Sequence, residues 1–473
     1  MTRLLLLAVD GLDWPRLQAL SATGQLPHCA RLAAVGWQAR LSLAPAPAFD
    51  AEADAAAAAD AAANADAAAA VAVDVDVDVD VDADIGAASR WVSLACGVGL
   101  AGHGITGDTV CDADGLRLRR PVAPDLWAMP LWQRAWQAGL DVRVVGWPAT
   151  QGAALPATAA AVGSVVVADG FQDAGIAALH AWPLAPDAVA PASARPLVRA
   201  ARMHPAEVDE TLLDAVLPPT LWPAEARTPA LRATSARLLA RWASVHNLGV
   251  HWCSEASAPG GASGPTDAPP QLLMLRLDGL PQWRQTATAL AAAHGVPLSD
   301  IETPWLTWLD MLLGRYAALM AGSAAGAGQR DGPGVRGVLM LLTDRSADGS
   351  EGGVLCSQPV PAVDAAAGLH VQGAEEALRT LCEVLGLPDP MGTDQAAMLS
   401  SSTSDAMARL RAAPLQDDAA LAWLQAEGQA PVDLAPLYQR AQAVRDAALK
   451  ALSGEGRQAL CPGEPAPEPI GPG

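Results

Sequence analysis

Lysine, phenylalanine and tyrosine are scarce in this chain of 473 residues: Lys450 is the only lysine, and two Phe and two Tyr stand beside 15 Trp. The formal net charge is -21. Nucleic acid and anionic membranes both require a basic surface, so this charge excludes them as partners. Basic residues are absent between Arg40 and Arg90, where ten Asp and one Glu fall. The rest of the chain carries about -10 and is typical of an acidic soluble protein.

Paired cysteine motifs and long apolar runs are also missing. The seven cysteines are scattered and none forms a Cys-x-x-Cys motif, which predicts free thiols in a reducing compartment and excludes a disulfide framework or a zinc ribbon. The first apolar run, residues 4–9, is too short to span a membrane, and no small-residue cleavage site follows it. We therefore expect a cytoplasmic protein.

Residues 44–87 form a low-complexity segment of alanine and aspartate that ends in "VDVDVDVDVDVDAD". Its period of two is that of a strand, but one face would consist entirely of carboxylates, so we predict a disordered insertion. Calcium loops need a Gly at the turn and carbonyl and Glu ligands at set positions, which the repeat lacks. Weak, unspecific cation binding is the most that we expect of it.

Apolar runs with strand character alternate with helical stretches along the chain. This order predicts an α/β fold whose central, mostly parallel sheet is sandwiched between helices. Three of the runs end on an aspartate, namely Asp10, Asp278 and Asp344, and neighbouring carboxyl ends of parallel strands converge on one crevice. The expected strands are residues 4–9, 142–147, 164–169, 271–278 and 337–344, and the expected helices include residues 130–140 and 231–246.

Several blocks, in the right order, resemble the alkaline phosphatase superfamily, in particular its type I phosphodiesterase/nucleotide pyrophosphatase family. They are "LLLLAVDGLDWPRLQALSATGQLPHCARLAAVGWQARL", "RWVSLACGVGLAGHGITGD", "LWQRAWQAGLDVRVVGWPAT", "RWASVHNLGVHW", "WLDMLLGRYAALM" and "EVLGLPDPMGTD". The resemblance implies an alkaline-phosphatase-like domain over residues 1–395, interrupted by the insertion. Residues 396–453 then form a helical appendage, and residues 454–473 a disordered tail.

The resemblance implies two-metal phosphoester hydrolysis, in which two zinc ions are held by three Asp and three His and activate a Ser or Thr nucleophile. Asp10, Asp278 and Asp344 match the three aspartates. Two of the histidine positions hold Gln282 and Arg345 instead, and no His occurs near the third, at residues 349–356. The nucleophile position holds Ala87, or Ala48 when the alignment is taken from the other side of the insertion.

Three carboxylates without imidazoles are too few ligands for tight zinc binding, and without a cation they would repel one another. A guanidinium can pair with carboxylates and take the place of a metal ion. Our hypothesis from the sequence is that Arg345 fills the vacated site by pairing with Asp344 and Asp10.

The remaining reactive residues have simpler interpretations. We expect His103 to be a structural hydrogen-bonding residue, and the spacing of His246 and His251 places them on different faces of a helix. His370 is a weak candidate for a substitute ligand. The remaining candidates are thiols and hydroxyls: Ser93 and Cys96 match ordinary positions of the family block, and Ser89 is a weak candidate nucleophile.

The sequence therefore predicts a degenerate, catalytically impaired bacterial member of this family, acting as a binding or regulatory pseudoenzyme for a small phosphorylated ligand or a protein partner. It would hold no cofactor or only a weakly bound divalent cation. The alternative is an active metal-dependent phosphoester hydrolase that uses magnesium or manganese on Asp10, Asp278 and Asp344. A third alternative, a decaying gene whose product folds poorly, is also compatible with the sequence.

Overall fold

The computed structural model describes residues 2–41, 86–105, 107–111, 118–173, 182–254, 270–325, 336–345, 351–357 and 371–390. The predicted insertion lies outside the described residues apart from its last two positions. The predicted appendage and tail, as well as His370, lie outside them entirely.

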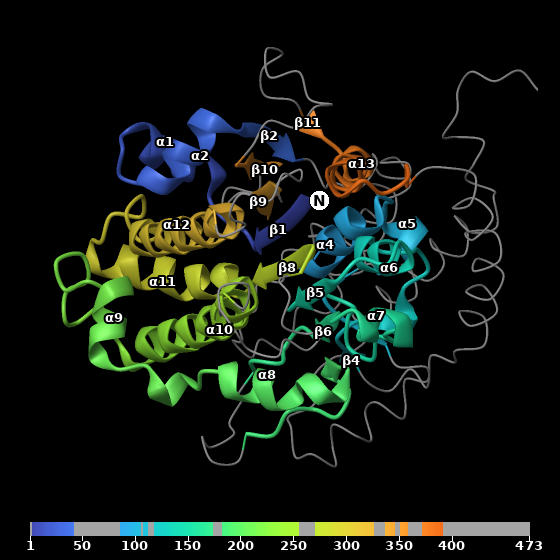
Figure 1. Cartoon of the computed structure of the whole chain (residues 1–473). Coiled ribbons are helices and arrows are strands. Elements are labelled where there is room, and N and C mark those ends of the chain that lie inside the picture. Colours follow the sequence, from blue (N-terminus) through green and yellow to red (C-terminus); the bar gives the residue numbers. More distant parts are fainter. Residues whose placement is uncertain are drawn as a thin grey trace, which may run out of the picture.

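A mostly parallel sheet is the centre of the fold (Figure 1). Across the described residues the strand order is β11-β2-β10-β9-β1-β8-β5-β6-β7. Strands β9, β1, β8, β5 and β6 are parallel neighbours, whereas β10 is antiparallel to both β9 and β2, and β7 is antiparallel to β6. The bounds are β1 Thr2–Val9, β2 Trp37–Leu41, β5 Val142–Val145, β6 Val165–Val167, β7 Val189–Ala190, β8 Leu272–Leu277, β9 Arg336–Arg345, β10 Glu351–Cys356 and β11 Val371–Gln372. All five predicted strands are confirmed.

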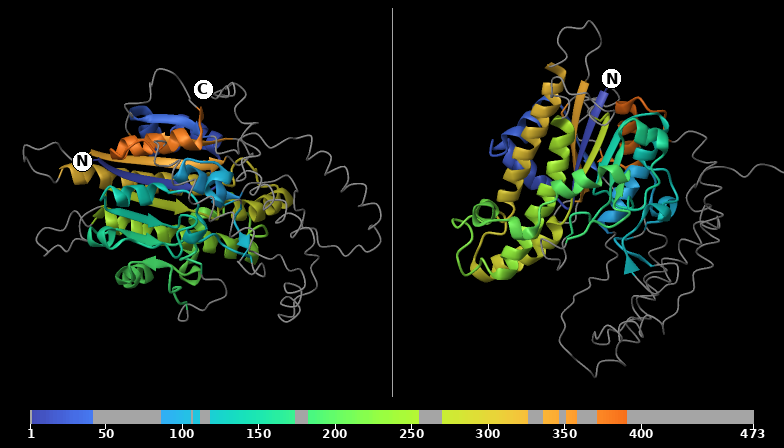
Figure 2. Two further views of the ribbon diagram at one scale, coloured as in Figure 1. Left: turned by 90° about the vertical axis from the view of Figure 1, so that its right-hand side faces the viewer. Right: turned by 60° about the horizontal axis from the view of Figure 1, so that its bottom comes forward.

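Helices cover both faces of this sheet (Figure 2). One layer contains α1 (Trp14–Ala22), α2 (Pro27–Val35), α10 (Pro229–Ser254), α11 (Leu280–His294) and α12 (Thr303–Ala325). The other contains α4 (Ala87–Cys96), α6 (Leu131–Gln137), α7 (Ala157–Ala161) and α13 (Ala374–Leu385). Shorter elements are α5 (Leu100–His103), α8 (Arg195–Ala201), α9 (Glu210–Val216) and the small ribbon of β3 (Val110–Cys111) and β4 (Leu118–Arg119). The predicted sandwich is confirmed.

The alternation of side chains along β1 explains this arrangement. Leu5 and Leu7 point into the core under α10 and α12, and Leu4 and Leu6 point into the core under α4 and α6. A strand that is buried on both faces must be apolar at every position, which is why the run reads as continuous leucine.

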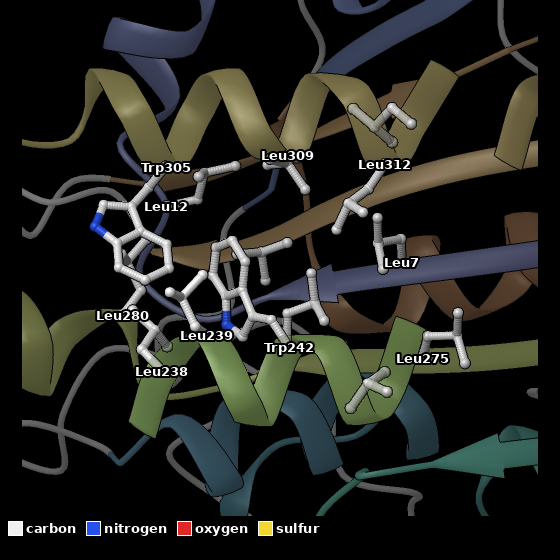
Figure 3. Close-up of a cluster of buried hydrophobic side chains, with 14 of the residues drawn as sticks. Leu7, Leu12, Leu238, Leu239, Trp242, Leu275, Leu280, Trp305, Leu309 and Leu312 are labelled. Carbon is white, nitrogen blue, oxygen red and sulfur yellow. The ribbon is translucent and has the colours of Figure 1, made fainter. Parts of the chain in front are cut away.

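Tryptophans fill much of the core beneath the first layer. The Trp305 ring centroid lies 5.5 Å from that of Trp242 and 5.3 Å from that of Trp283, both in edge-to-face geometry. Figure 3 shows Trp305 and Trp242 between α12 and α10, with Leu309 beside them. Edge-to-face packing of this kind fixes the rings relative to one another.

The thiols that the structure describes are consistent with the composition. Cys29, Cys96, Cys253, Cys356 and Cys382 are all free and buried, as expected. Within the described part of the chain, none of the helices combines the length and the apolar character needed to cross a membrane.

Candidate functional site

The three predicted aspartates meet at the carboxyl ends of adjacent strands. In the register of the sheet, Val9 of β1 lies beside Leu277 of β8 and Thr343 of β9, so the next residue of each chain segment falls at the same edge. The Gly11 amide donates to Asp344 Oδ1 at 2.8 Å and ties the end of β1 to that of β9. The expected convergence of the strand ends is confirmed.

Gly11 itself is required at this turn. Its φ of 56° lies in the left-handed region, and a Cβ atom at this position would come within 2.8 Å of Pro281 Cγ. Only glycine adopts this conformation without strain and leaves the space free. The Asp10-Gly11 pair is thus a tight turn that holds the Asp10 carboxylate at the edge of the sheet.

Asp10 is paired with an arginine from the neighbouring strand β8. Arg276 donates through Nε to Asp10 Oδ1 at 2.9 Å and through Nη2 to Oδ2 at 2.6 Å, and Trp91 Nε1 of α4 donates to Oδ1 at 2.7 Å. Both members of the pair are buried. Burial, together with the nearby Asp344 carboxylate, outweighs the opposing effect of Arg276 and raises the pKa of Asp10 to about 6.

Asp344 is paired with a different arginine, Arg90, which lies on α4. Arg90 Nε donates to Asp344 Oδ2 at 2.9 Å. Arg90 Nη2 forms an ion pair with the same oxygen at 2.8 Å. Since Oδ1 already accepts from the Gly11 amide, both oxygens of this buried carboxylate have donors.

Asp278 is paired with yet another arginine, Arg241, which lies on α10. Arg241 Nη1 donates to Asp278 Oδ2 at 3.2 Å, and Gln172 Nε2 donates to Oδ1 at 3.1 Å. Arg241 also pairs with Asp173, which in turn pairs with Arg120. Although burial alone would raise the pKa of Asp278, the surrounding guanidinium groups, Arg241 foremost, hold it below its ordinary value.

The sequence hypothesis about Arg345 stays a prediction, while Asp10 and Asp344 have other arginine partners among the described residues. Asp10 pairs with Arg276 and Asp344 pairs with Arg90, because the neighbouring strand and the helix above the same face bring these guanidinium groups to the carboxylates. Arg345 is the last residue of β9, and its side chain lies outside the described residues. The described guanidinium partners of these two carboxylates are thus Arg276 and Arg90.

The other positions of the predicted site carry no catalytic group. Gln282 lies exposed on the first turn of α11. Ala87 is the first residue of α4 and has no hydroxyl, and Ala48 lies outside the described residues. Strand β10, in the region where the resemblance places the last histidine, contains none.

Ser93 and His103 form a buried pair whose geometry is structural. Their side chains are joined by a 2.8 Å hydrogen bond between Ser93 Oγ and His103 Nε2, while His103 Nδ1 accepts the Ile105 amide at 3.1 Å. With Nδ1 as acceptor, the ring proton resides on Nε2 and is donated to Ser93, so the imidazole is unable to act as its base. Burial lowers the pKa of His103 to about 3. The structural role expected of His103 is confirmed.

The remaining candidates also lack an activating partner. Ser89 Oγ is buried in α4 and has no hydrogen-bond partner within the described ranges. Burial raises the pKa of Cys96 to about 12, far from that of a reactive thiol. His246 contacts the Tyr316 hydroxyl through Nδ1 at 3.1 Å. None of these groups supplies a nucleophile with a base beside it.

A pair of zinc ions does not fit these residues. Both oxygens of Asp10, Asp344 and Asp278 accept hydrogen bonds from protein donors, chiefly guanidinium groups. Among the residues described, no group of three or more His, Cys, Asp and Glu is arranged so that it could hold a metal ion. A cation at this edge would have to displace an arginine that already pairs with its carboxylate.

The sequence did not reveal the three arginines that pair with the aspartates. It also did not reveal two buried acceptor atoms, which belong to Asp169 and Gln172. Arg276 was the most visible signal, because a charge inside an otherwise apolar strand needs a buried partner. After β6, Asp169 Oδ1 and Gln172 Oε1 are both buried without a hydrogen-bond partner inside the described ranges. Burial raises the pKa of Asp169 to about 6.

Comparison with known proteins finds similarity among solved structures. No protein-family model matches the chain, and no curated protein matches it. Among solved structures, it is similar to phosphonoacetate hydrolase from Sinorhizobium meliloti 1021 in complex with phosphonoacetate and with phosphonoformate. The identity is 15% in both cases, with TM-scores of 0.36 and 0.34 and coverage of 73% and 74% of this chain. The chain spans only 56% and 59% of the length of those two chains, and a likeness this low assigns it no activity.

Proposed function

We propose that this chain is a catalytically impaired relative of the alkaline phosphatase superfamily, related to the type I phosphodiesterase/nucleotide pyrophosphatase family, which binds rather than hydrolyses. One observation carries the proposal: each carboxylate at a position that the resemblance assigns to a metal ligand is paired with an arginine. The pairs are Asp10 with Arg276, Asp344 with Arg90, and Asp278 with Arg241.

The chemistry of the guanidinium group supports this interpretation. An arginine is permanently charged and binds a carboxylate through two parallel donors, so it neutralises the site without exchanging with solvent. It has no vacant orbital with which to polarise a phosphoryl oxygen or to activate a hydroxyl, as a Lewis-acidic metal does. With Ala87 at the nucleophile position, the site lacks both halves of the hydrolytic machinery.

The order of the sequence blocks supports the family assignment independently of the site. The block around Asp10 forms the first strand and its turn, and the block around Arg90 forms the helix that covers the carboxylates. We propose a small phosphorylated ligand or a protein partner as the binding target, and the bacterial cytoplasm as the compartment.

Metal content and hydrolysis together test the proposal. The purified full chain is incubated with zinc, magnesium and manganese and then analysed by mass spectrometry, and hydrolysis of bis(p-nitrophenyl) phosphate is followed in parallel. We expect near-zero metal stoichiometry and no hydrolysis above the level of the Asp10→Asn variant. Asp187→Asn serves as a matched control, because Asp187 is an exposed carboxylate outside the site.

The opposite outcome would favour the active hydrolase. One or two tightly held ions per chain, with hydrolysis that is lost in Asp10→Asn but kept in Asp187→Asn, would mean that the carboxylates exchange their arginines for metal. Hydrolysis that is equal in all three proteins would come from a contaminant and would leave the absence of intrinsic activity in place.

A further inference from the structure

A cavity of about 760 Å³ lies between α9, α12 and the start of α1. It shares no residue with the three carboxylate pairs, and its helices stand on the other side of the sheet from α4 (Figure 1). Its volume falls in the range of about 300–1,000 Å³ that is typical of sites for small organic molecules. The size therefore permits a ligand, and the lining decides which kind.

The walls of the cavity are apolar and one of them is rigid. Leu212 and Val216 of α9 line the cavity, together with Trp308 and Met311 of α12. The Trp308 ring stacks on that of Trp305, with centroids 6.1 Å apart and planes at 19°. Trp305 is itself locked in the core shown in Figure 3, so the indole wall is held in place before any ligand arrives.

One end of the cavity is polar. Arg16 Nη2 donates to Asp300 Oδ1 at 3.0 Å and to Thr303 Oγ1 at 3.2 Å, which fixes the guanidinium at this end. The Arg16 side chain is 28% exposed and is part of the cavity lining, so a ligand in the cavity can contact it. An acceptor on a ligand gains free energy where it meets a charged donor such as a guanidinium.

The charges at this end limit the class of ligand. Asp300, which is half-exposed, carries a negative charge that offsets Arg16 and disfavours an anion. A neutral acceptor such as a carbonyl oxygen matches the Arg16 guanidinium without this repulsion, and a flat apolar body matches the indole wall. We propose that the cavity binds a small, neutral, planar apolar molecule whose carbonyl oxygen accepts a hydrogen bond from Arg16.

The probe for this proposal is 6-propionyl-2-(dimethylamino)naphthalene, which is neutral, planar and fluorescent and carries one ketone. Titrated into the full-length protein, it should bind saturably at one molecule per chain, with emission shifted to the blue. Met311→Glu places a charge in the apolar wall at a position that is 58% exposed, so the fold tolerates it. We expect this variant to weaken binding by about tenfold or more.

Two controls make the result specific. Val35→Glu on α2 is the matched variant, since Val35 is 60% exposed and does not line the cavity, and it should leave binding unchanged. Arg16→Met should weaken binding of the ketone about fivefold, while binding of N-phenyl-1-naphthylamine, a fluorescent analogue without a carbonyl, stays the same. Near-ultraviolet circular dichroism confirms that each variant is folded.

The proposal is overturned if the full-length protein does not bind the ketone saturably, or if Met311→Glu and Val35→Glu bind it equally well. It is also overturned if Arg16→Met weakens binding of both probes alike, because the carbonyl then plays no part. These measurements use neither metal nor hydrolysis, so their failure is separate from that of the proposed pseudoenzyme function.

Discussion

The carboxylate of Asp10 and the guanidinium of Arg276 form two parallel hydrogen bonds, of 2.9 and 2.6 Å, between adjacent strands in the interior of the protein. Trp91 of α4 covers the site, so the pair is largely shielded from bulk water. A buried pair of this kind contributes little net stability compared with apolar residues of the same shape, but breaking it strands a charge in the core. Removing one partner should therefore cost much more stability than removing both, and this difference can be measured.

The first prediction concerns the loss of one partner. Arg276→Met leaves the Asp10 carboxylate buried and unpaired, so we expect the free energy of unfolding to fall by about 3–5 kcal/mol, measured by urea denaturation at neutral pH. Adding Asp10→Asn to this variant removes the stranded charge, and the double variant should recover a large part of the loss. A double variant as unstable as Arg276→Met would show that the arginine acts through packing rather than through its charge.

The second prediction concerns the geometry of the Arg90 pair with Asp344. Lysine keeps the charge but lacks the planar fork that places two donors on one carboxylate oxygen. We expect Arg90→Lys to lower the free energy of unfolding by about 1–3 kcal/mol, because a buried charged acceptor loses a donor.

The matched control for this change is Arg379→Lys on α13. Arg379 pairs with Glu375 at 2.9 Å, but the two side chains are 48% and 58% exposed. Such a surface pair is worth about 0–1 kcal/mol, so thermal unfolding should hardly change. Equal effects of the two substitutions would contradict a special role for the buried pair.

The sequence predicted the central strands and the meeting point of the aspartates because both depend on local pattern. A continuous apolar run that ends in Asp marks a buried parallel strand, and the parallel order then fixes where Asp10, Asp278 and Asp344 lie. The family, the ligand and the compartment remain proposals, since they depend on contacts that pattern does not encode.

The sequence did not show which arginine pairs with which aspartate. Arg276 and Arg90 lie far from their carboxylates along the chain, and only the register of β8 and the placement of α4 bring them into contact. Adjacency in sequence favoured Arg345 and gave no indication of these two pairs, which join separate elements. Very short strands such as β7 and β11 also lack enough residues to show a period.

The third prediction concerns the tautomer of His103. Burial lowers its pKa to about 3, so the ring stays neutral, with its proton on Nε2, throughout the stable pH range. In nuclear magnetic resonance spectra, the ring signals of His103 should not shift between pH 7.5 and pH 5. Since an unfolded histidine gains its proton near pH 6.5, this residue contributes stability that is lost progressively as the pH falls below that value. A titration midpoint near 6 would contradict the assigned hydrogen bonds.

The fourth prediction concerns Asp169, whose Oδ1 is buried without a donor in the described part of the chain. Burial raises the pKa of this carboxyl from 3.8 to about 6, so the folded protein holds the proton more tightly than the unfolded chain does. The associated stability is therefore present below about pH 4 and is lost as the pH rises through 6.

Asp169→Asn removes this charge and should stabilise the protein at pH 8 by on the order of 2 kcal/mol, with little change at pH 4, as measured by urea denaturation. Because the pKa of Asp10 is also raised to about 6, part of the pH dependence should persist in this variant and disappear only when Asp10 is also replaced. Asp187→Asn, at an exposed carboxylate, should change stability equally at both pH values or not at all. If Asp169→Asn instead destabilises the protein more at pH 8 than at pH 4, the ionised Asp169 carboxylate has a stabilising partner in the folded chain.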